Sequence, residues 1–212
     1  MVDIIPAILT ESETELIRLV RIFERAGVSR VHLDVCDGVF VPTRTIKGYE
    51  ELARLETSVK FDVHLMVARP ELACANWCAS VRADRFFVHV EAVQDFAILA
   101  GHAHECGKTL GAAINPETPL ARLDAVVGHT NIIQFMTVHP GQQGRTFVPE
   151  ALERMRQFHA THPDIVLSAD GGVTPQTAPS CVAAGASLLV SGSYIVRAAD
   201  PARALAELTS VT

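Results

Sequence analysis

The chain has 212 residues, of which 49% are hydrophobic and 20% are charged, and its formal net charge is −6. This composition is typical of a folded globular protein and excludes disordered, collagen-like and coiled-coil classes. The acidic balance and the absence of long basic runs argue against a nucleic-acid partner. No long apolar run or signal-peptide pattern is present, so we expect a soluble, cytoplasmic protein with no membrane partner.

Short apolar, β-branched runs alternate with longer segments of helical period along the chain, a pattern typical of parallel strands joined by helices. We predict eight strands, over residues 4–9, 30–34, 59–66, 85–90, 109–114, 131–138, 165–169 and 188–190. The eight predicted helices fall between and after them, over residues 11–25, 49–55, 71–81, 93–105, 120–127, 149–159, 175–184 and 201–208.

Local signals mark several helix starts. Thr10 and Glu13 have the spacing of a capping box and are predicted to start the first helix. Pro149, Pro175 and Pro201 suit the first turn of their helices, because a missing N–H group there removes no intrahelical hydrogen bond.

Eight strand–helix units in this length allow about 26 residues per unit, which is close to the minimum for a parallel crossover. No linker-like segment separates the units. We therefore predict that residues 1–212 form one catalytic domain, a closed (β/α)8 TIM barrel. The alternative, an open doubly wound sheet, normally has a glycine-rich turn after its first strand, whereas residues 9–12 are Leu-Thr-Glu-Ser.

Catalytic groups of such barrels lie at the carboxyl ends of the strands. The second predicted strand places His32 and Asp34 on one face, because side chains alternate along a strand. The third carries His64 near its end, and the seventh is followed by Asp170. A single polar residue at a strand end usually makes only local hydrogen bonds, but four such residues at matching depth favour a site for a divalent transition metal.

Glycine-containing loops form a second set of candidates. Many barrels hold a phosphate group on backbone N–H groups of the loops after strands seven and eight, where this chain has Gly171-Gly172 and Gly192-Ser193. A further loop, 140–145, follows predicted strand six and either closes over a ligand or forms a simple turn. Asp62 either orients a neighbouring ligand or belongs to a hydrogen-bond network inside the barrel.

The chain resembles the ribulose-phosphate 3-epimerase family in blocks spread along its length, namely residues 6–9, 32–42, 62–66, 115–119, 136–141, 170–172 and 191–193. The resemblance implies that His32, Asp34, His64 and Asp170 hold the metal and that Asp34 and Asp170 also act as acid and base. The substrate and phosphate contacts that we expect are Ala7, His64, Met136, Gly141, Gln142, Gln143, Gly144, Gly171, Gly172, Gly192 and Ser193.

The implied reaction is inversion of C3 in a ketose phosphate, D-ribulose 5-phosphate to D-xylulose 5-phosphate, through a metal-stabilised enediolate. We expect one divalent ion as cofactor, with Zn favoured over Fe, Mn or Co, a small sugar phosphate as partner, and possible homo-oligomers. The chain departs from the family at Ala7, Cys36, Val39, Thr43 and the 142–143 pair. These departures leave open 3-epimerisation of another phosphorylated ketose, such as D-allulose 6-phosphate, or binding of a phosphosugar without turnover.

Overall fold

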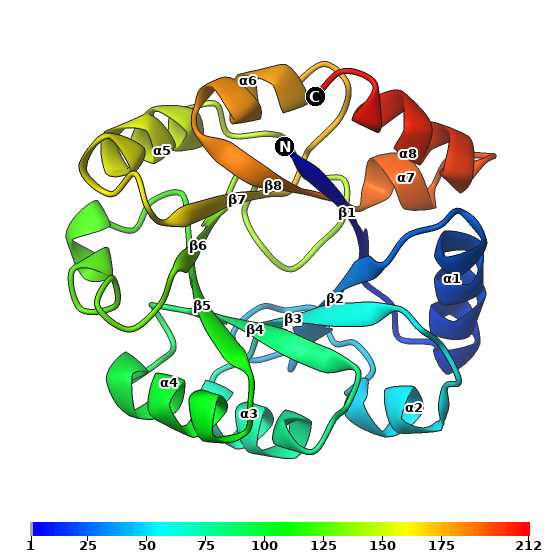
Figure 1. The fold of residues 1–212 in the computed structure, drawn as a ribbon, viewed down its shortest axis with the longest axis horizontal. Helices are drawn as coiled ribbons and strands as arrows, with labels where there is room; N and C mark the ends of the chain where they lie inside the picture. Colours follow the sequence, from blue (N-terminus) through cyan, green and yellow to red (C-terminus); the bar gives the residue numbers. More distant parts are fainter. Residues whose placement is uncertain (1) are drawn as a thin grey trace.

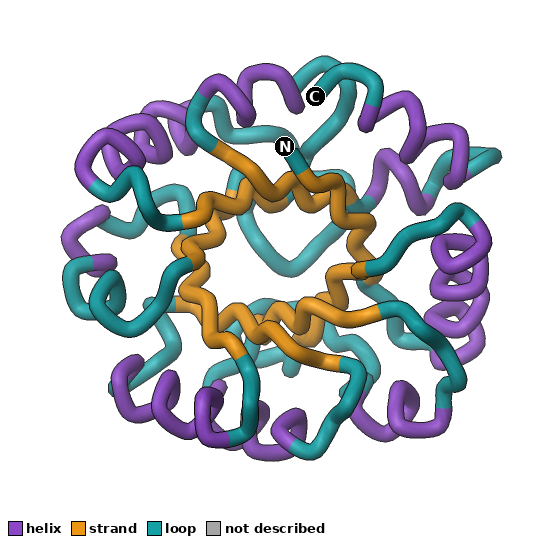
Figure 2. The backbone as a smooth tube through the Cα atoms, viewed as in Figure 1, coloured by secondary structure: helices purple, strands orange, loops and turns teal. Residues whose placement is uncertain are grey.

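The structure is a computed structural model that describes residues 2–212. Eight parallel strands pair in chain order and close into a barrel, surrounded by helices (Figures 1 and 2). The strands are β1 (Asp3–Ile8), β2 (Arg30–Cys36), β3 (Lys60–Met66), β4 (Ala83–His89), β5 (Thr109–Ile114), β6 (Ile132–Met136), β7 (Val166–Asp170) and β8 (Ala186–Ser191). The predicted TIM-barrel fold is therefore confirmed.

The helices lie outside the ring of strands. They are α1 (Glu13–Arg25), α2 (Tyr49–Arg54), α3 (Pro70–Cys78), α4 (Phe96–Glu105), the 3-10 helix η1 (Leu120–Leu123), α5 (Glu150–Thr161), α6 (Ala178–Ala183), α7 (Ser193–Val196) and α8 (Pro201–Thr209). Between residues 2 and 212, no helix combines the length and the apolar character needed to cross a bilayer.

The start of α1 differs from the prediction. Its N-cap is Ser12, whose hydroxyl accepts a hydrogen bond from the backbone N–H of Glu15 at 3.3 Å. Ser12 and Glu15 repeat the capping-box spacing two residues later than Thr10 and Glu13. The Thr10 hydroxyl instead accepts from the Ser12 N–H at 3.0 Å, so the predicted capping box at Thr10 is wrong.

Two other predicted helices are shorter than expected. The segment predicted over 120–127 forms only η1, followed by turns. Helix α6 begins at Ala178, so Pro175 precedes it and does not lie in its first turn. The Thr177 hydroxyl accepts from the Thr174 N–H at 2.9 Å and donates to the Gly172 carbonyl at 2.8 Å. These bonds hold residues 172–177 in a turn that shortens the helix.

The barrel interior is a packed core. Inward-facing apolar side chains of four strands form one cluster, which contains Ile5, Ala7, Phe87, Ile132, Leu188 and Val190. A Cβ at Gly111 would lie 2.7 Å from the Phe87 ring, so glycine is required where this ring fills the interior. Outward-facing strand residues pack against the helices in a second, larger cluster. The two layers fix the strands and therefore the positions of the polar residues at their ends.

A charge network closes the amino-terminal end of the barrel. Asp62 is fully buried and accepts hydrogen bonds from Arg30 at 2.6 Å and from Arg85 Nε at 2.7 Å. Arg30 also binds Asp84 at 2.6 Å. Of the two roles considered for Asp62, the structure shows the hydrogen-bond network inside the barrel.

Candidate active site

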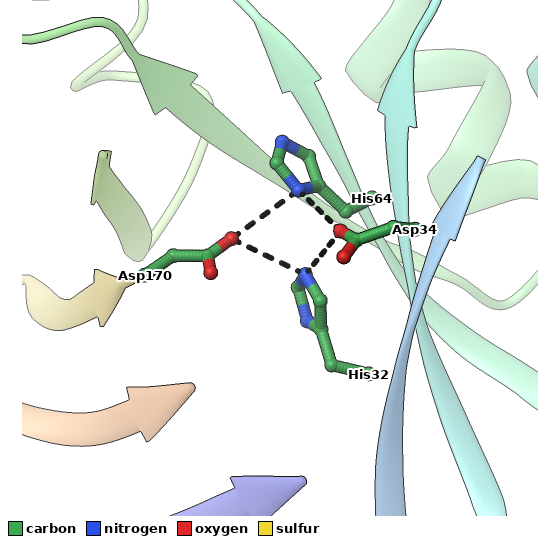
Figure 3. Close-up of side chains that lie close together, drawn as sticks. All are labelled: His32, Asp34, His64 and Asp170. Carbon is green, nitrogen blue, oxygen red and sulfur yellow. Dashed lines mark hydrogen bonds and ion pairs between the residues drawn. The ribbon is translucent and has the colours of Figure 1, made fainter. Parts of the chain in front are cut away.

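The pairing of β2 with β3 and the position of β7 bring four polar residues together. Asp34 lies directly opposite His64 in the β2–β3 register, and His32 lies one inward-facing position below Asp34 on the same strand. Asp170 is the last residue of β7, across the barrel from β2. Figure 3 shows the four side chains pointing toward one common centre.

The distances within this cluster are short. Nδ1 of His64 lies 3.0 Å from Oδ1 of Asp34 and 3.3 Å from Oδ2 of Asp170. Nε2 of His32 lies 3.6 Å and 3.5 Å from the same two oxygens. One potential ligand atom from each residue lies within 4.8 Å of every other, and all four residues are buried. The predicted grouping of His32, Asp34, His64 and Asp170 is what the structure shows.

The chemistry of this donor set fits a divalent transition metal. Two imidazole nitrogens and two carboxylate oxygens are ligands that such ions accept. Within residues 2–212, neither ring nitrogen of His32 has a hydrogen-bond partner, although the ring is fully buried. A buried polar atom without a partner is costly, and a cation held between the four side chains would give His32 one.

Charges within the cluster shift two pKa values. Burial alone would raise the pKa of Asp170, but the facing imidazoles of His32 and His64 hold it well below its usual range. Burial alone would lower the pKa of His64, but the carboxylates of Asp170 and Asp34 raise it to about 9. Asp170 is therefore ionised near neutral pH, and a cation that binds His64 at Nδ1 displaces a proton.

A pocket opens above the cluster, at the carboxyl ends of the strands. It is lined by twelve of the predicted site residues and reaches no atom of His32 or His64, which lie beneath its floor. The predicted lining residues are Ala7, Asp34, Met136, Gly141, Gln142, Gln143, Gly144, Asp170, Gly171, Gly172, Gly192 and Ser193. The lining also includes Leu9, Met66 and Arg145.

Steric contacts require glycine at the two positions that follow β7. Gly171 and Gly172 have φ values of +106° and +62°. A Cβ at Gly171 would overlap the side chain of Val138, and one at Gly172 would lie 3.1 Å from the Phe147 ring. The absence of side chains leaves the backbone of this loop accessible from the pocket, as phosphate binding requires.

The loop 140–145 crosses the carboxyl-terminal mouth of the barrel, seen behind the ring of strands in Figure 1. The Gln143 amide donates to the Ala7 carbonyl at 3.4 Å, and Arg197 donates to the Gln143 carbonyl at 3.3 Å. The loop thus bridges β1 and the segment after α7 and covers the pocket. Within residues 2–212, positive φ occurs only at glycines, so Gln142 and Gln143 carry no strain of this kind.

Three buried or half-buried residues beside the cluster escaped the sequence analysis. His89 Nε2 lies 2.9 Å from His64 Nε2, and His89 Nδ1 lies 3.3 Å from Glu91 Oε2. The Gln134 amide donates to Asp170 Oδ2 at 2.7 Å. His89 is the last residue of β4 and Glu91 follows it in the next turn, with the same spacing as His32 and Asp34, so the strand-end pattern indicates both residues.

Comparison with known proteins agrees with this geometry. The model of the "Ribulose-phosphate 3 epimerase family" matches residues 3–196. The chain belongs to the ribulose-phosphate 3-epimerase family. It is 32% identical over 214 residues to the ribulose-phosphate 3-epimerase of Bacillus subtilis (strain 168), covering 98% of each chain. It is 34% identical over 208 residues to that of Synechocystis sp., covering 95% of this chain and 90% of the relative.

Solved structures show the same fold in proteins of other names. A 3-hexulose-6-phosphate synthase superposes with a TM-score of 0.73 at 18% identity, covering 98% of each chain. An orotidine 5'-monophosphate decarboxylase from Sulfolobus solfataricus gives 0.66 at 12% identity, covering 100% of this chain and 97% of the other. The family membership, and not these likenesses, makes the chain an isomerase acting on carbohydrates and supports epimerase activity on ribulose 5-phosphate.

Proposed function

We propose that residues 1–212 form one catalytic domain, a metal-dependent 3-epimerase that interconverts D-ribulose 5-phosphate and D-xylulose 5-phosphate. The observation that carries the proposal is the pair of buried carboxylates, Asp34 on β2 and Asp170 on β7, which face one another beneath a pocket. Binding alone requires no such pair, whereas inversion of a carbon beside a carbonyl requires one group on each face.

His32, Asp34, His64 and Asp170 would hold the divalent cation. When bound there, the cation supplies Lewis-acid charge that makes the C3 proton of an adjacent ketose more acidic. Zn²⁺ suits four nitrogen and oxygen ligands, and Fe, Mn or Co ions accept the same set.

Asp34 and Asp170 move the protons. In each direction, one carboxylate accepts the C3 proton on its side of the substrate and the other, in its acid form, donates a proton to the opposite face. The low pKa of Asp170 gives the ionised form that accepts a proton. The hydrogen bond from Gln134 holds one Asp170 oxygen, which orients the carboxylate toward the pocket.

The remaining lining positions the substrate. Backbone N–H groups of Gly171, Gly172, Gly192 and Ser193 are suited to a phosphate group at one end of the pocket. Met136 and the other apolar side chains of the lining, which are Leu9, Met66 and Val138, exclude water from the reacting carbons. Anchoring a remote phosphate uses its binding energy to hold C3 between the two carboxylates.

Ala7 contributes only a methyl group to the pocket lining. Because a small side chain at this position obstructs little of the pocket, the experiment includes a second, longer substrate. The purified protein, loaded separately with Zn²⁺, Mn²⁺, Fe²⁺ or Co²⁺, is mixed with D-ribulose 5-phosphate or with D-allulose 6-phosphate, and products are followed by NMR. Faster turnover of D-ribulose 5-phosphate supports the proposal. Turnover of D-allulose 6-phosphate alone contradicts the proposed substrate, and turnover of neither contradicts the proposed reaction. A cytoplasmic location and a homo-oligomeric state remain predictions.

A further inference from the structure

A chain of hydrogen bonds leads from His64 away from the proposed metal site. Nε2 of His64 lies 2.9 Å from Nε2 of His89, and Nδ1 of His89 lies 3.3 Å from Oε2 of Glu91. Both imidazoles are fully buried, and their ring planes differ by only 20° with centroids 5.0 Å apart, which suits a hydrogen bond between the ring edges. The proposed reaction gives no role to His89 or to Glu91.

The carboxylate at the far end sets the direction of these hydrogen bonds. An ionised Glu91 has only acceptor atoms, so His89 donates from Nδ1. A neutral His89 ring then has its lone pair at Nε2 and accepts the N–H of His64 Nε2. Once a cation displaces the Nδ1 proton of His64, Nδ1 becomes the nitrogen with the lone pair, and it lies 3.0 Å from Asp34 and 3.3 Å from Asp170.

Two neighbours hold this arrangement in place. The backbone N–H of Asn115 donates to Oε1 of Glu91 at 2.9 Å, which leaves Oε2 for His89. The ring of Phe40 packs against His89 with centroids 4.7 Å apart and a tilt of 47° between the rings. One oxygen of the Glu91 carboxylate therefore accepts a hydrogen bond from the backbone, and the other faces His89. We call the chain of hydrogen bonds from Glu91 through His89 to His64 the relay.

We infer that Glu91 and His89 are positioning residues that hold His64 in the tautomer whose Nδ1 binds the cation, an inference that rests on the proposed function. The opposite tautomer would point an N–H group at the cation and remove one ligand. Hydrogen bonds to the distal nitrogen of a metal-binding imidazole fix its tautomer in this way, and their loss typically weakens metal binding by about 10- to 100-fold.

The substitution Glu91→Gln tests the inference because it should reverse the relay without changing side-chain size. The backbone N–H of Asn115 retains the carbonyl oxygen of the new amide, so its NH₂ group faces His89 Nδ1. His89 must then donate from Nε2, which places the proton of His64 on Nδ1. We expect Zn²⁺ affinity, measured by competition with a chromophoric chelator, to fall by about 10- to 100-fold.

Glu117→Gln is the matched control. Glu117 also contacts a histidine, His139, at 2.5 Å, but both side chains are more than half exposed and neither belongs to the proposed site. We expect its Zn²⁺ affinity to equal that of the wild type. Thermal unfolding of the cation-free variants checks that both retain the fold.

The outcomes separate the relay from the proposed function. Zn²⁺ affinity of Glu91→Gln within about threefold of the wild type overturns the relay. In ¹⁵N-histidine NMR of the zinc-loaded wild type, a proton on His64 Nε2 and coordination through Nδ1 support it, and coordination through Nε2 overturns it. A wild type that binds no divalent cation overturns the relay and the metal site together. A wild type that binds Zn²⁺ through His64 Nδ1 but epimerises no ketose phosphate supports the relay and contradicts the proposed function.

Discussion

Replacing Asp170 by asparagine removes one of the two proposed proton-transfer groups with almost no change in shape. The amide cannot accept the C3 proton, and loss of a positioned acid–base group costs about 10²- to 10⁴-fold in rate. At about 1.36 kcal/mol per tenfold change, this corresponds to roughly 3 to 5 kcal/mol of transition-state stabilisation. The substitution also removes the anionic oxygen that lies 3.3 Å from His64 and 3.5 Å from His32, so cation binding weakens as well.

The assay measures kcat at saturating Zn²⁺ and saturating D-ribulose 5-phosphate, which separates the lost proton transfer from weaker cation binding. Asp164→Asn, an exposed site before β7, makes the same charge change outside the proposed site and should leave kcat unchanged. Because Asp34 remains, we expect the Asp170→Asn protein to exchange the C3 proton of one epimer with D₂O while inversion is lost. Epimerisation at near wild-type kcat would refute the role of Asp170.

Three further predictions concern the cation, the glycine loop and pH. Dialysis against dipicolinate should abolish epimerisation, and added Zn²⁺, Mn²⁺ or Co²⁺ should restore it; activity that persists after removal of all metal, checked by elemental analysis, argues against the site. Gly171→Ala should lower stability by at least about 2 kcal/mol in urea unfolding, because a Cβ at φ +106° overlaps Val138, and an unchanged midpoint contradicts this packing. Hydrogen bonds from Thr57 and Arg21 lower the pKa of Glu24 to about 2, whereas its pKa in the unfolded chain is near 4.5. The ionised Glu24 carboxylate therefore stabilises the fold fully above pH 4.5, and this stabilisation is lost as the pH falls through 2. The stability difference between wild type and Glu24→Gln should therefore shrink between pH 6 and pH 2.5, and a constant difference contradicts it.

The barrel and the central cluster could be predicted from the sequence because both follow from short-range periodicity. Alternation along a strand places His32 and Asp34 on one face, and parallel pairing brings the ends of β2, β3 and β7 to one mouth of the barrel. The same test applied to β4 would have selected His89. His89 follows a continuous apolar run, Phe86 to Val88, in which a single histidine stands out weakly.

The details of the loops could not be predicted, because they depend on hydrogen bonds between segments. Ser12 competes with Thr10 for the same capping role, and the sequence contains both patterns. The turn at residues 172–177 depends on the Thr177 hydroxyl reaching the Gly172 carbonyl. The pairing of Gln143 with the Ala7 carbonyl joins residues 136 positions apart, which no local pattern indicates.

The most direct measurement of the two-carboxylate account is NMR of the reaction of D-ribulose 5-phosphate in D₂O with the cation-loaded protein. The account predicts D-xylulose 5-phosphate that carries deuterium at C3 from the first turnover, because the proton leaves to one aspartate and a solvent-derived one arrives from the other. Product that retains its original C3 proton, or that carries deuterium at C1 instead, would contradict it.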